Sequence, residues 1–360
     1  MIRKSILVSL IFMAFFAGSR VNAAGGEGLF FPGGNIVLRD GDILLTYVPS
    51  LLNSCNRMFA KPEGKYAHAL LYIEFPGKGG RLVDFSADGL TADEVKDHLA
   101  KLRAVALVRA RVLPEKGKLA AAFEDMKRRY DAGKLKFDFS LRWTDNEDGR
   151  YYCTEFISHL FRQSGLSDPF PLWKFPVDDF WVRWYSEHLD IDYRRIVSPN
   201  APLYLPDFEL VAEYQNKDPA AERNELILDA IFARIGHYLR EDEMEIRGPS
   251  LGSRFIVNLA GLGLFGGPLV RGLPRKSRTV FIILKEYVLT VASRVERTIS
   301  LHKDEDWTAE DISALTRCIS DAMRDRYFIH LRGKSRVSTR GGNSALLNKF
   351  FRQLTEPAAG

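Results

Sequence analysis

The chain has 360 residues, which is long enough for two ordinary domains or for one domain with large additions. Apolar residues make up 46% of the sequence, charged residues 27% and aromatic residues 12%, so we expect a packed core and exclude wholesale disorder. The formal net charge is +5, from 51 basic and 46 acidic side chains. So small a surplus on so long a chain argues against general nucleic-acid binding.

Residues 1–23 have the pattern of a secretory signal peptide. Arg3 and Lys4 form a charged start, Ile6 to Gly18 is an apolar run without charge, and small residues precede the expected cleavage site after Ala23. The apolar run is shorter than the about 20 residues of a membrane-spanning helix, which favours cleavage over an uncleaved anchor. We therefore expect an exported protein that is periplasmic or secreted.

The stretch from Asp40 to Ile196 mixes short strands with helices. The predicted strands, of which the middle two are joined by a Gly-rich hairpin, are Ile43–Val48, His68–Phe75, Leu82–Ala87 and Val105–Val112. Helical spacing of apolar residues predicts helices over Lys118–Ala132 and Thr154–Ser164. We expect an α+β domain over residues 36–200, in which an antiparallel sheet packs on helices.

The chain changes character after a cluster of prolines at 199–206, which we interpret as a linker. Beyond it we expect a mostly α-helical region over residues 215–360, of unassigned role and without strands. Its predicted helices are Ala220–Leu239, Thr279–Thr298, Thr308–Tyr327 and Ser344–Leu354, the third of them opened by a capping arrangement of Thr308 and Asp311.

Two features of this region bear on membrane contact. Phe255–Val270 carries no charge, and we favour a buried hairpin or helix over membrane contact because it is short for a membrane span. Arg332, Lys334, Arg336 and Arg340 form a basic stretch that is typical of a solvated loop. Contact with anionic phospholipid is the sharper alternative, so peripheral membrane contact through the C-terminal region stays open.

The cysteines are Cys55, Cys153 and Cys318, too few for a disulfide scaffold and odd in number. Cys153 lies in Tyr152-Cys153-Thr154, where a polar stretch changes into a predicted helix. A thiol at a helix N-terminus meets unpaired N–H groups and the positive end of the helix dipole, which favour the nucleophilic thiolate. The alternative interpretation is an inert thiol buried in the core.

A nucleophilic Cys needs a base, which is usually a His held by a third polar group. His68 opens a predicted strand that is apolar on both faces, although a structural His is the simpler interpretation of that position alone. His159 follows Cys153 on the same helix, but it lies about 240° further round and so faces away from the thiol. The remaining histidines lie among charged residues or in the helical region: His98, His188, His237, His302 and His330.

Asp84 lies in the strand after the hairpin, flanked by apolar residues, where a carboxylate is costly unless it is paired. If the hairpin centres near Pro76, Asp84 lies opposite His68, whereas a hairpin centred on Lys78 puts Asp88 there. We favour Asp84 because Asp88 is equally typical of a turn.

A strand-opening His, a strand acid after a hairpin and a Tyr-Cys-Thr-Glu helix start resemble the circularly permuted NlpC-type, papain-like cysteine hydrolases, the YaeF/YiiX group. The Asp40-Gly41-Asp42 opening is also similar to the start of such domains. The resemblance covers residues 36–200 and implies a permuted papain-like fold, in which the His strand precedes the Cys helix. It implies Cys153 as nucleophile, His68 as base and Asp84 as the third catalytic residue.

The same order of elements argues against Cys55, which lies too close to His68 in sequence to meet it as a papain-like pair. We interpret Cys55 and Cys318 as buried, or as paired with each other. Glu155 is interpreted as structural support at the helix start, and Tyr152 as a group that helps to orient an oxyanion.

We therefore expect an exported cysteine hydrolase of amidase or peptidase type, which cleaves an amide or ester carbonyl through a thioester acyl-enzyme. Its substrate is either a cell-wall peptide or a lipid acyl group. The alternative is a catalytically silent papain-like module whose helical half engages a partner or a membrane surface. No metal or cofactor is predicted, because no close Cys/His cluster, His-Glu-x-x-His pattern or Gly-rich phosphate loop is present.

Overall fold

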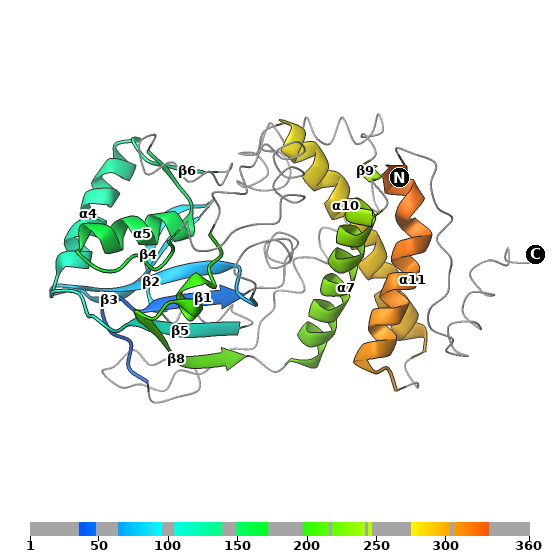
Figure 1. The fold of residues 1–360 in the computed structure, drawn as a ribbon, viewed down its shortest axis with the longest axis horizontal. Helices are drawn as coiled ribbons and strands as arrows, with labels where there is room; N and C mark the ends of the chain where they lie inside the picture. The colour runs from blue at the N-terminus through cyan, green and yellow to red at the C-terminus, as the bar shows by residue number, and fades with distance from the viewer. Residues whose placement is uncertain are drawn as a thin grey trace, which may run out of the picture. The chain divides into compact units, whose positions relative to one another are not determined.

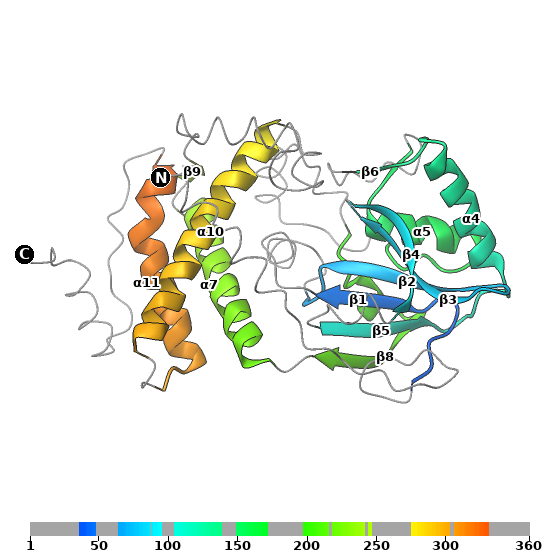
Figure 2. The same ribbon diagram turned by 180° about the vertical axis from the view of Figure 1, so that it is seen from behind.

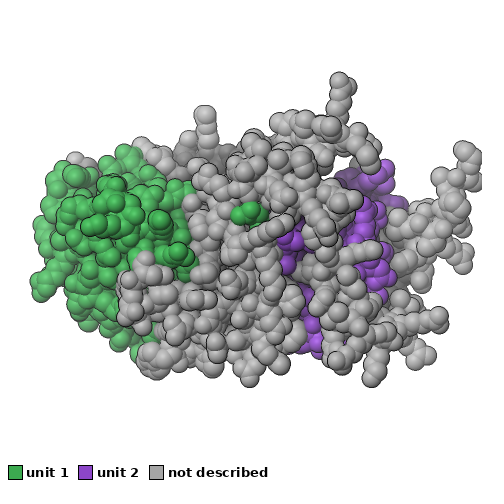
Figure 3. Space-filling view, turned by 90° about the horizontal axis from the view of Figure 1, so that it is seen from above, with its two compact units in different colours: residues 1–217, 258–278 green, residues 218–257, 279–360 purple. Residues whose placement is uncertain are grey.

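The computed structural model describes residues 36–47, 64–86, 88–95, 104–138, 149–171, 197–215, 218–241, 244–246, 275–302 and 306–330. The chain divides into two compact units, residues 1–217 with 258–278 and residues 218–257 with 279–360, which are coloured green and purple in Figure 3. The expected signal peptide, the uncharged segment, the basic stretch and the last expected helix lie outside the described residues.

The first unit is built on a six-stranded antiparallel sheet with the strand order β4-β3-β2-β1-β5-β8. Figure 1 shows this sheet with its helices, and Figure 2 shows it from behind. The strands are β1 (Ile43–Tyr47), β2 (His68–Phe75), β3 (Gly79–Ser86), β4 (Gly89–Asp93), β5 (Ala104–Ala110) and β8 (Phe208–Gln215). The unit is therefore α+β with an antiparallel sheet, as expected at this level.

Helices cover one face of the sheet. The helices α4 (Lys118–Asp131) and α5 (Cys153–Gln163) pack on β2, and α5 also contacts β3. Because side chains alternate along a strand, β2 contributes Leu71 and Ile73 to the core beneath these helices, while Leu70 and Tyr72 join a second cluster on the opposite face. Both faces are buried, which explains why these strands read as continuous apolar runs in the sequence.

A buried ion pair joins β1 and β5. Arg109 on β5 donates to Asp42, which directly precedes β1, through Nε and Nη2, each at 2.7 Å. Asp42 is fully buried and Arg109 is 8% exposed. Asp42 also accepts from the Arg39 backbone N–H at 2.8 Å, so this carboxylate fixes the turn that leads into the sheet.

The sheet extends past the end of the expected domain at residue 200. Strand β8 pairs with β5 from Ala110↔Phe208 to Ala104↔Gln215, and a short 3-10 helix over Ala201–Tyr204 replaces the expected linker. Strand β8 lies at the sheet edge, and charged residues such as Glu209 interrupt its alternation of apolar and polar side chains. The sequence pattern therefore did not predict this strand. Strand β4 was missed as well.

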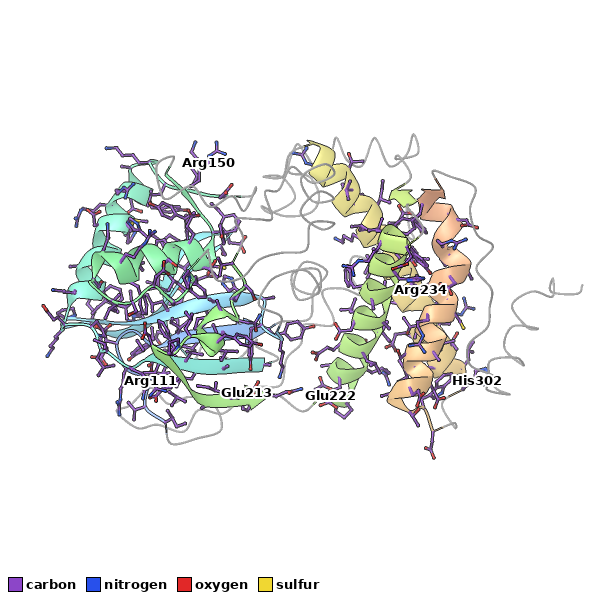
Figure 4. All side chains as sticks on the ribbon, in the orientation of Figure 1. Arg111, Arg150, Glu213, Glu222, Arg234 and His302 are labelled. Atoms are coloured by element: carbon purple, nitrogen blue, oxygen red, sulfur yellow. The ribbon has the colours of Figure 1, made fainter. Side chains whose placement is uncertain are left out.

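The second unit contains the helices α7 (Pro219–Glu241) and α11 (Ala309–Tyr327), together with α10 (Arg275–Leu301) from residue 279 onwards. The capping box of Thr308 and Asp311 at the start of α11 is confirmed. A bidentate ion pair joins Arg234 on α7, labelled in Figure 4, to Asp321 on α11, with N–O distances of 2.6 and 3.0 Å.

The expectation that this region lacks strands was wrong. Strand β9 (Met244–Ile246) pairs with β10 (Phe328–His330) in a two-stranded sheet, a pairing too short to leave a period in the sequence. None of the helices in the described ranges is both long and apolar enough to cross a membrane.

Candidate active site

Cys153 is the first residue of α5. Tyr152 precedes it in extended conformation (φ −111°, ψ 173°) and provides the N-cap, without a side-chain capping bond. The Phe156 N–H donates to the Tyr152 carbonyl at 2.9 Å. The Phe156 ring packs against the ring of Phe85 on β3, with 5.1 Å between the ring centroids. The buried aromatic face of α5 thus fixes where the helix begins, and it leaves the partly exposed Cys153 at its positive end.

His68 is the first residue of β2, paired with Thr46 of β1. Its Nε2 lies 2.8 Å from Oδ1 of Asp84 on β3. The charge of the Cys153 side chain also raises the pKa of His68, so the thiol and the ring lie near one another. The structure therefore brings together the three residues that the sequence analysis selected.

The strand register that joins His68 and Asp84 differs from both registers considered above. The chain turns at Pro76-Gly77-Lys78, where Lys78 N–H donates to the Phe75 carbonyl at 3.0 Å, and the first pair across the turn is Phe75↔Gly79. The hairpin is therefore centred on Gly77, whose φ of 73° suits the turn.

This register makes the His68–Asp84 contact diagonal. The last pair along the ladder is Leu71↔Val83, so Asp84 lies one residue beyond Val83 and His68 three residues before Leu71. The pleat puts Asp84 and His68 on the same side of the ladder, within reach of a diagonal side-chain contact. The direct cross-strand position predicted for Asp84 was wrong, although the hydrogen bond to His68 forms.

Electrostatics favours a charged His68. Burial of the ring opposes the imidazolium, but the negative charges of Asp84 and Cys153 and the hydrogen bond to Asp84 outweigh it. The pKa of His68 is therefore raised well above its ordinary value. The side chains of His68 and Asp84 are 26% and 14% exposed, so water screens this charge pair only in part.

The competing residues lie elsewhere. Asp88 is in the exposed turn between β3 and β4, where its N–H donates to Ser86. His159 packs edge-on against the Tyr151 ring, with a centroid distance of 5.4 Å. Burial, aided by the positive charges of Arg162 and Arg129, lowers the pKa of His159 to about 4, which keeps this ring neutral at neutral pH.

The other cysteines do not form part of this site. Cys318 lies on α11 in the second unit as a free, partly buried thiol. Burial first, and the nearby Asp321 charge second, raise the pKa of Cys318. Cys55 lies outside the described residues.

Two residues close to Cys153 in sequence, Tyr152 and Glu155, are buried. The Tyr152 hydroxyl lies near the backbone of Val197 and the side chain of Thr154. Burial, and then the Glu155 charge, raise the pKa of Tyr152 well above its ordinary value. Glu155 itself is fully buried in the first turn of α5.

Asn200 was not among the predicted site residues, yet it contacts the backbone two residues before His68. It lies in the proline-rich stretch interpreted as a linker, yet it is 1% exposed. An Asn beside two prolines is typical of an exposed turn. Only a prediction of strand β8 could have indicated that this stretch is buried.

The chemistry open to this site is that of an activated thiol. Asp84 occupies Nε2 of His68, which leaves Nδ1 as the ring nitrogen for proton exchange with Cys153. The first N–H groups of α5 have no partner within the helix and point towards its N-terminal end. In the described part of the chain, no group of three or more His, Cys, Asp or Glu side chains could hold a metal ion.

No protein-family model and no curated protein sequence matches this chain. Among solved structures, the chain is similar to the crystal structure of the metalloprotein YiiX from Escherichia coli O157:H7. The TM-score is 0.39 and the sequence identity 18%, over 49% of this chain and 98% of that chain. The description as a metalloprotein is that of YiiX.

Proposed function

We propose that this chain is a cysteine hydrolase of amidase or peptidase type, with Cys153 as nucleophile, His68 as general base and acid, and Asp84 as the group that orients the His68 ring. One observation carries the proposal. The Asp84 carboxylate lies 2.8 Å from His68, and the thiol at the start of α5 is near enough to the same imidazole to raise its pKa. A nucleophile, a base and an orienting group within reach of one another are the arrangement that covalent catalysis requires.

The reaction follows from these positions. His68 takes the thiol proton, and Cys153 Sγ attacks the carbonyl carbon of an amide or ester. The backbone N–H of Cys153 is the first donor to the developing oxyanion. As the C–N or C–O bond breaks, His68 returns the proton to the leaving amine or alcohol, and a thioester remains. Water activated by His68 then attacks the thioester, which releases the acid and restores the thiol.

The order of the parts supports a permuted papain-like arrangement. The His strand β2 comes first, the acid of β3 second and the Cys helix α5 last. The helix packs on the two strands that carry His68 and Asp84, so one compact unit contains all three residues. An inert core thiol, the simpler interpretation of Cys153, does not account for its partly exposed place at the start of a helix near a paired His and Asp.

The substrate class is a cell-wall peptide or a lipid acyl group, and one experiment separates them. The protein is incubated with a cell-wall peptide amide and with a long-chain acyl ester, quenched in acid and weighed by mass spectrometry. A mass increase on the Cys153 peptide that matches one acyl group identifies the substrate class, and Cys153→Ala removes the adduct. If neither substrate leaves an adduct or is turned over, the alternative of a silent binding module is supported.

We further propose that the protein is exported with removal of residues 1–23, because their charge and apolar pattern is that of a signal peptide. N-terminal sequencing of the mature chain tests this. A first residue of Ala24 supports export, whereas a mature chain that still begins at Met1 contradicts it.

A further inference from the structure

The segment Val197–Asn200 is buried along its whole length although it is neither helix nor strand. Val197 and Asn200 are each 1% exposed and Ser198 is fully buried. A buried loop must find partners for its polar groups, because water cannot supply them. The partners of this segment lie at the starts of β2 and α5, the elements that begin with His68 and Cys153.

Asn200 holds the chain as it enters β2. Its Oδ1 accepts from the Tyr66 N–H at 3.0 Å, and its Nδ2 donates to the Tyr66 carbonyl at 2.8 Å. Nδ2 also donates to Ser198 Oγ at 2.7 Å. Both backbone polar groups of Tyr66 are therefore bound by one side chain, two residues before His68.

Gly64 makes room for this contact. A Cβ at Gly64 would lie 2.3 Å from Cγ and 2.3 Å from Oδ1 of Asn200, distances that real Cβ atoms do not show. The absence of a side chain at this position therefore lets the backbone pass over the amide of Asn200.

Tyr66 has a further partner on the sheet edge. Its hydroxyl donates to Glu213 of β8, a residue labelled in Figure 4. The backbone and the side chain of Tyr66 are thus held by two separate elements, which leaves little freedom for the residues that follow.

The other end of the segment contacts the start of α5. Thr154 Oγ1 donates to the Val197 carbonyl at 3.4 Å, and the Val197 backbone lies near the Tyr152 hydroxyl. Thr154 and Tyr152 are the residues on either side of Cys153. One buried segment therefore contacts both neighbours of the thiol and the chain that leads into His68.

We propose that Asn200 is a positioning residue that, through the backbone of Tyr66, holds His68 beside Cys153, an inference that rests on the function proposed for this pair. Asn200 itself contacts none of the reacting atoms. It acts because any movement of Tyr66 moves the start of β2, while Val197 keeps the start of α5 in place.

The test compares three variants of the full chain. Asn200→Ala removes both bonds to Tyr66, and Gly64→Ala displaces the same amide while leaving Asn200 in the sequence. Ser198→Ala is the matched control, because it removes only the bonds from Asn200 to Ser198. Two quantities are measured, the rate at which iodoacetamide alkylates Cys153 at neutral pH and the titration of the His68 ring by NMR.

We expect Asn200→Ala and Gly64→Ala to slow alkylation about 10- to 100-fold, the size of effect that a small misplacement of reacting groups produces. The His68 pKa should return towards its ordinary value in both, because the ring moves away from Cys153. Ser198→Ala should leave both quantities near those of the wild type. A merely structural Asn200 would lower the thermal midpoint without changing the His68 titration of the folded protein.

If Asn200→Ala and Gly64→Ala fold, and if both keep the alkylation rate and the His68 titration of the wild type, the inference is overturned. Failure of both variants to fold would also overturn it, since the segment would then serve the fold as a whole. If wild-type Cys153 reacts no faster than an ordinary cysteine, the proposed function fails. The His68 titration in the variants still decides separately whether Asn200 positions the ring.

Discussion

The negative charge of Asp84 is the strongest influence that keeps a proton on the ring of His68 against the effect of burial. Asp84→Asn removes this charge but keeps the size of the side chain. The pKa of His68 should therefore fall, because the imidazolium loses its main electrostatic partner. Turnover should also fall steeply, since the ring loses the group that fixes its orientation. NMR titration of the His68 ring measures the first effect directly.

Asp88→Asn is the matched control for this substitution. Asp88 lies four residues after Asp84 in an exposed turn. Its replacement by Asn should leave the His68 titration and turnover unchanged. An unchanged His68 pKa in Asp84→Asn, or an equal effect of Asp88→Asn, would contradict the role given to Asp84.

At the scale of elements, the parts nearest the site were the most predictable. Strands β2 and β3 are short apolar runs on either side of a Pro-Gly turn, and α5 has a one-sided aromatic face, so local pattern was enough to place His68, Asp84 and Cys153. The register was not predictable from the pattern alone. Several turns fit Pro76-Gly77-Lys78-Gly79-Gly80, and only the packed sheet selects the one centred on Gly77.

Contacts between distant parts of the chain could not be predicted from the sequence pattern. Strand β8 is an edge strand with a weak alternation, and its identity depends on pairing with β5. Without β8, the segment Val197–Asn200 had no visible reason to be buried. The hydrogen bonds of Asn200 therefore could not be inferred, because they join residues 134 positions apart.

The ion pair between β1 and β5 provides a prediction at this scale. Asp42→Asn leaves the Arg109 charge buried without its carboxylate partner, so the free energy of unfolding should fall by about 3–5 kcal/mol. Asp125→Asn breaks an exposed pair with Arg128 on α4, whose N–O distance is 3.0 Å, and should change stability by about 1 kcal/mol or less. Chemical denaturation measures both. An equal loss of unfolding free energy in the two variants would contradict the stabilising role given to Asp42.

For the molecule as a whole, the division into units predicts that the chemistry belongs to the first of them. A fragment over residues 24–217 keeps the six-stranded sheet and the three proposed catalytic residues. It should fold and should still react with a thiol-directed probe at Cys153. Circular dichroism and peptide mapping of the labelled fragment provide the measurement.

The control fragment ends at residue 205, before β8. It loses the partner strand of β5 and the Glu213 partner of Tyr66, so it should fold poorly and label slowly. An unfolded 24–217 fragment would show instead that later residues complete the first unit, of which 258–278 also form part.

The most direct test of the central claim compares two thiols of the same wild-type chain. Cys153 and Cys318 are alkylated with iodoacetamide at neutral pH, and the labelled peptides are followed in time by mass spectrometry. Burial and Asp321 raise the pKa of Cys318, so that thiol should react slowly, whereas the His68 imidazolium should keep Cys153 reactive. We predict that Cys153 is labelled at least about tenfold faster than Cys318, and that His68→Ala slows the labelling of Cys153 but not that of Cys318. Labelling of Cys153 no faster than that of Cys318 would contradict the assignment of Cys153 as an activated nucleophile.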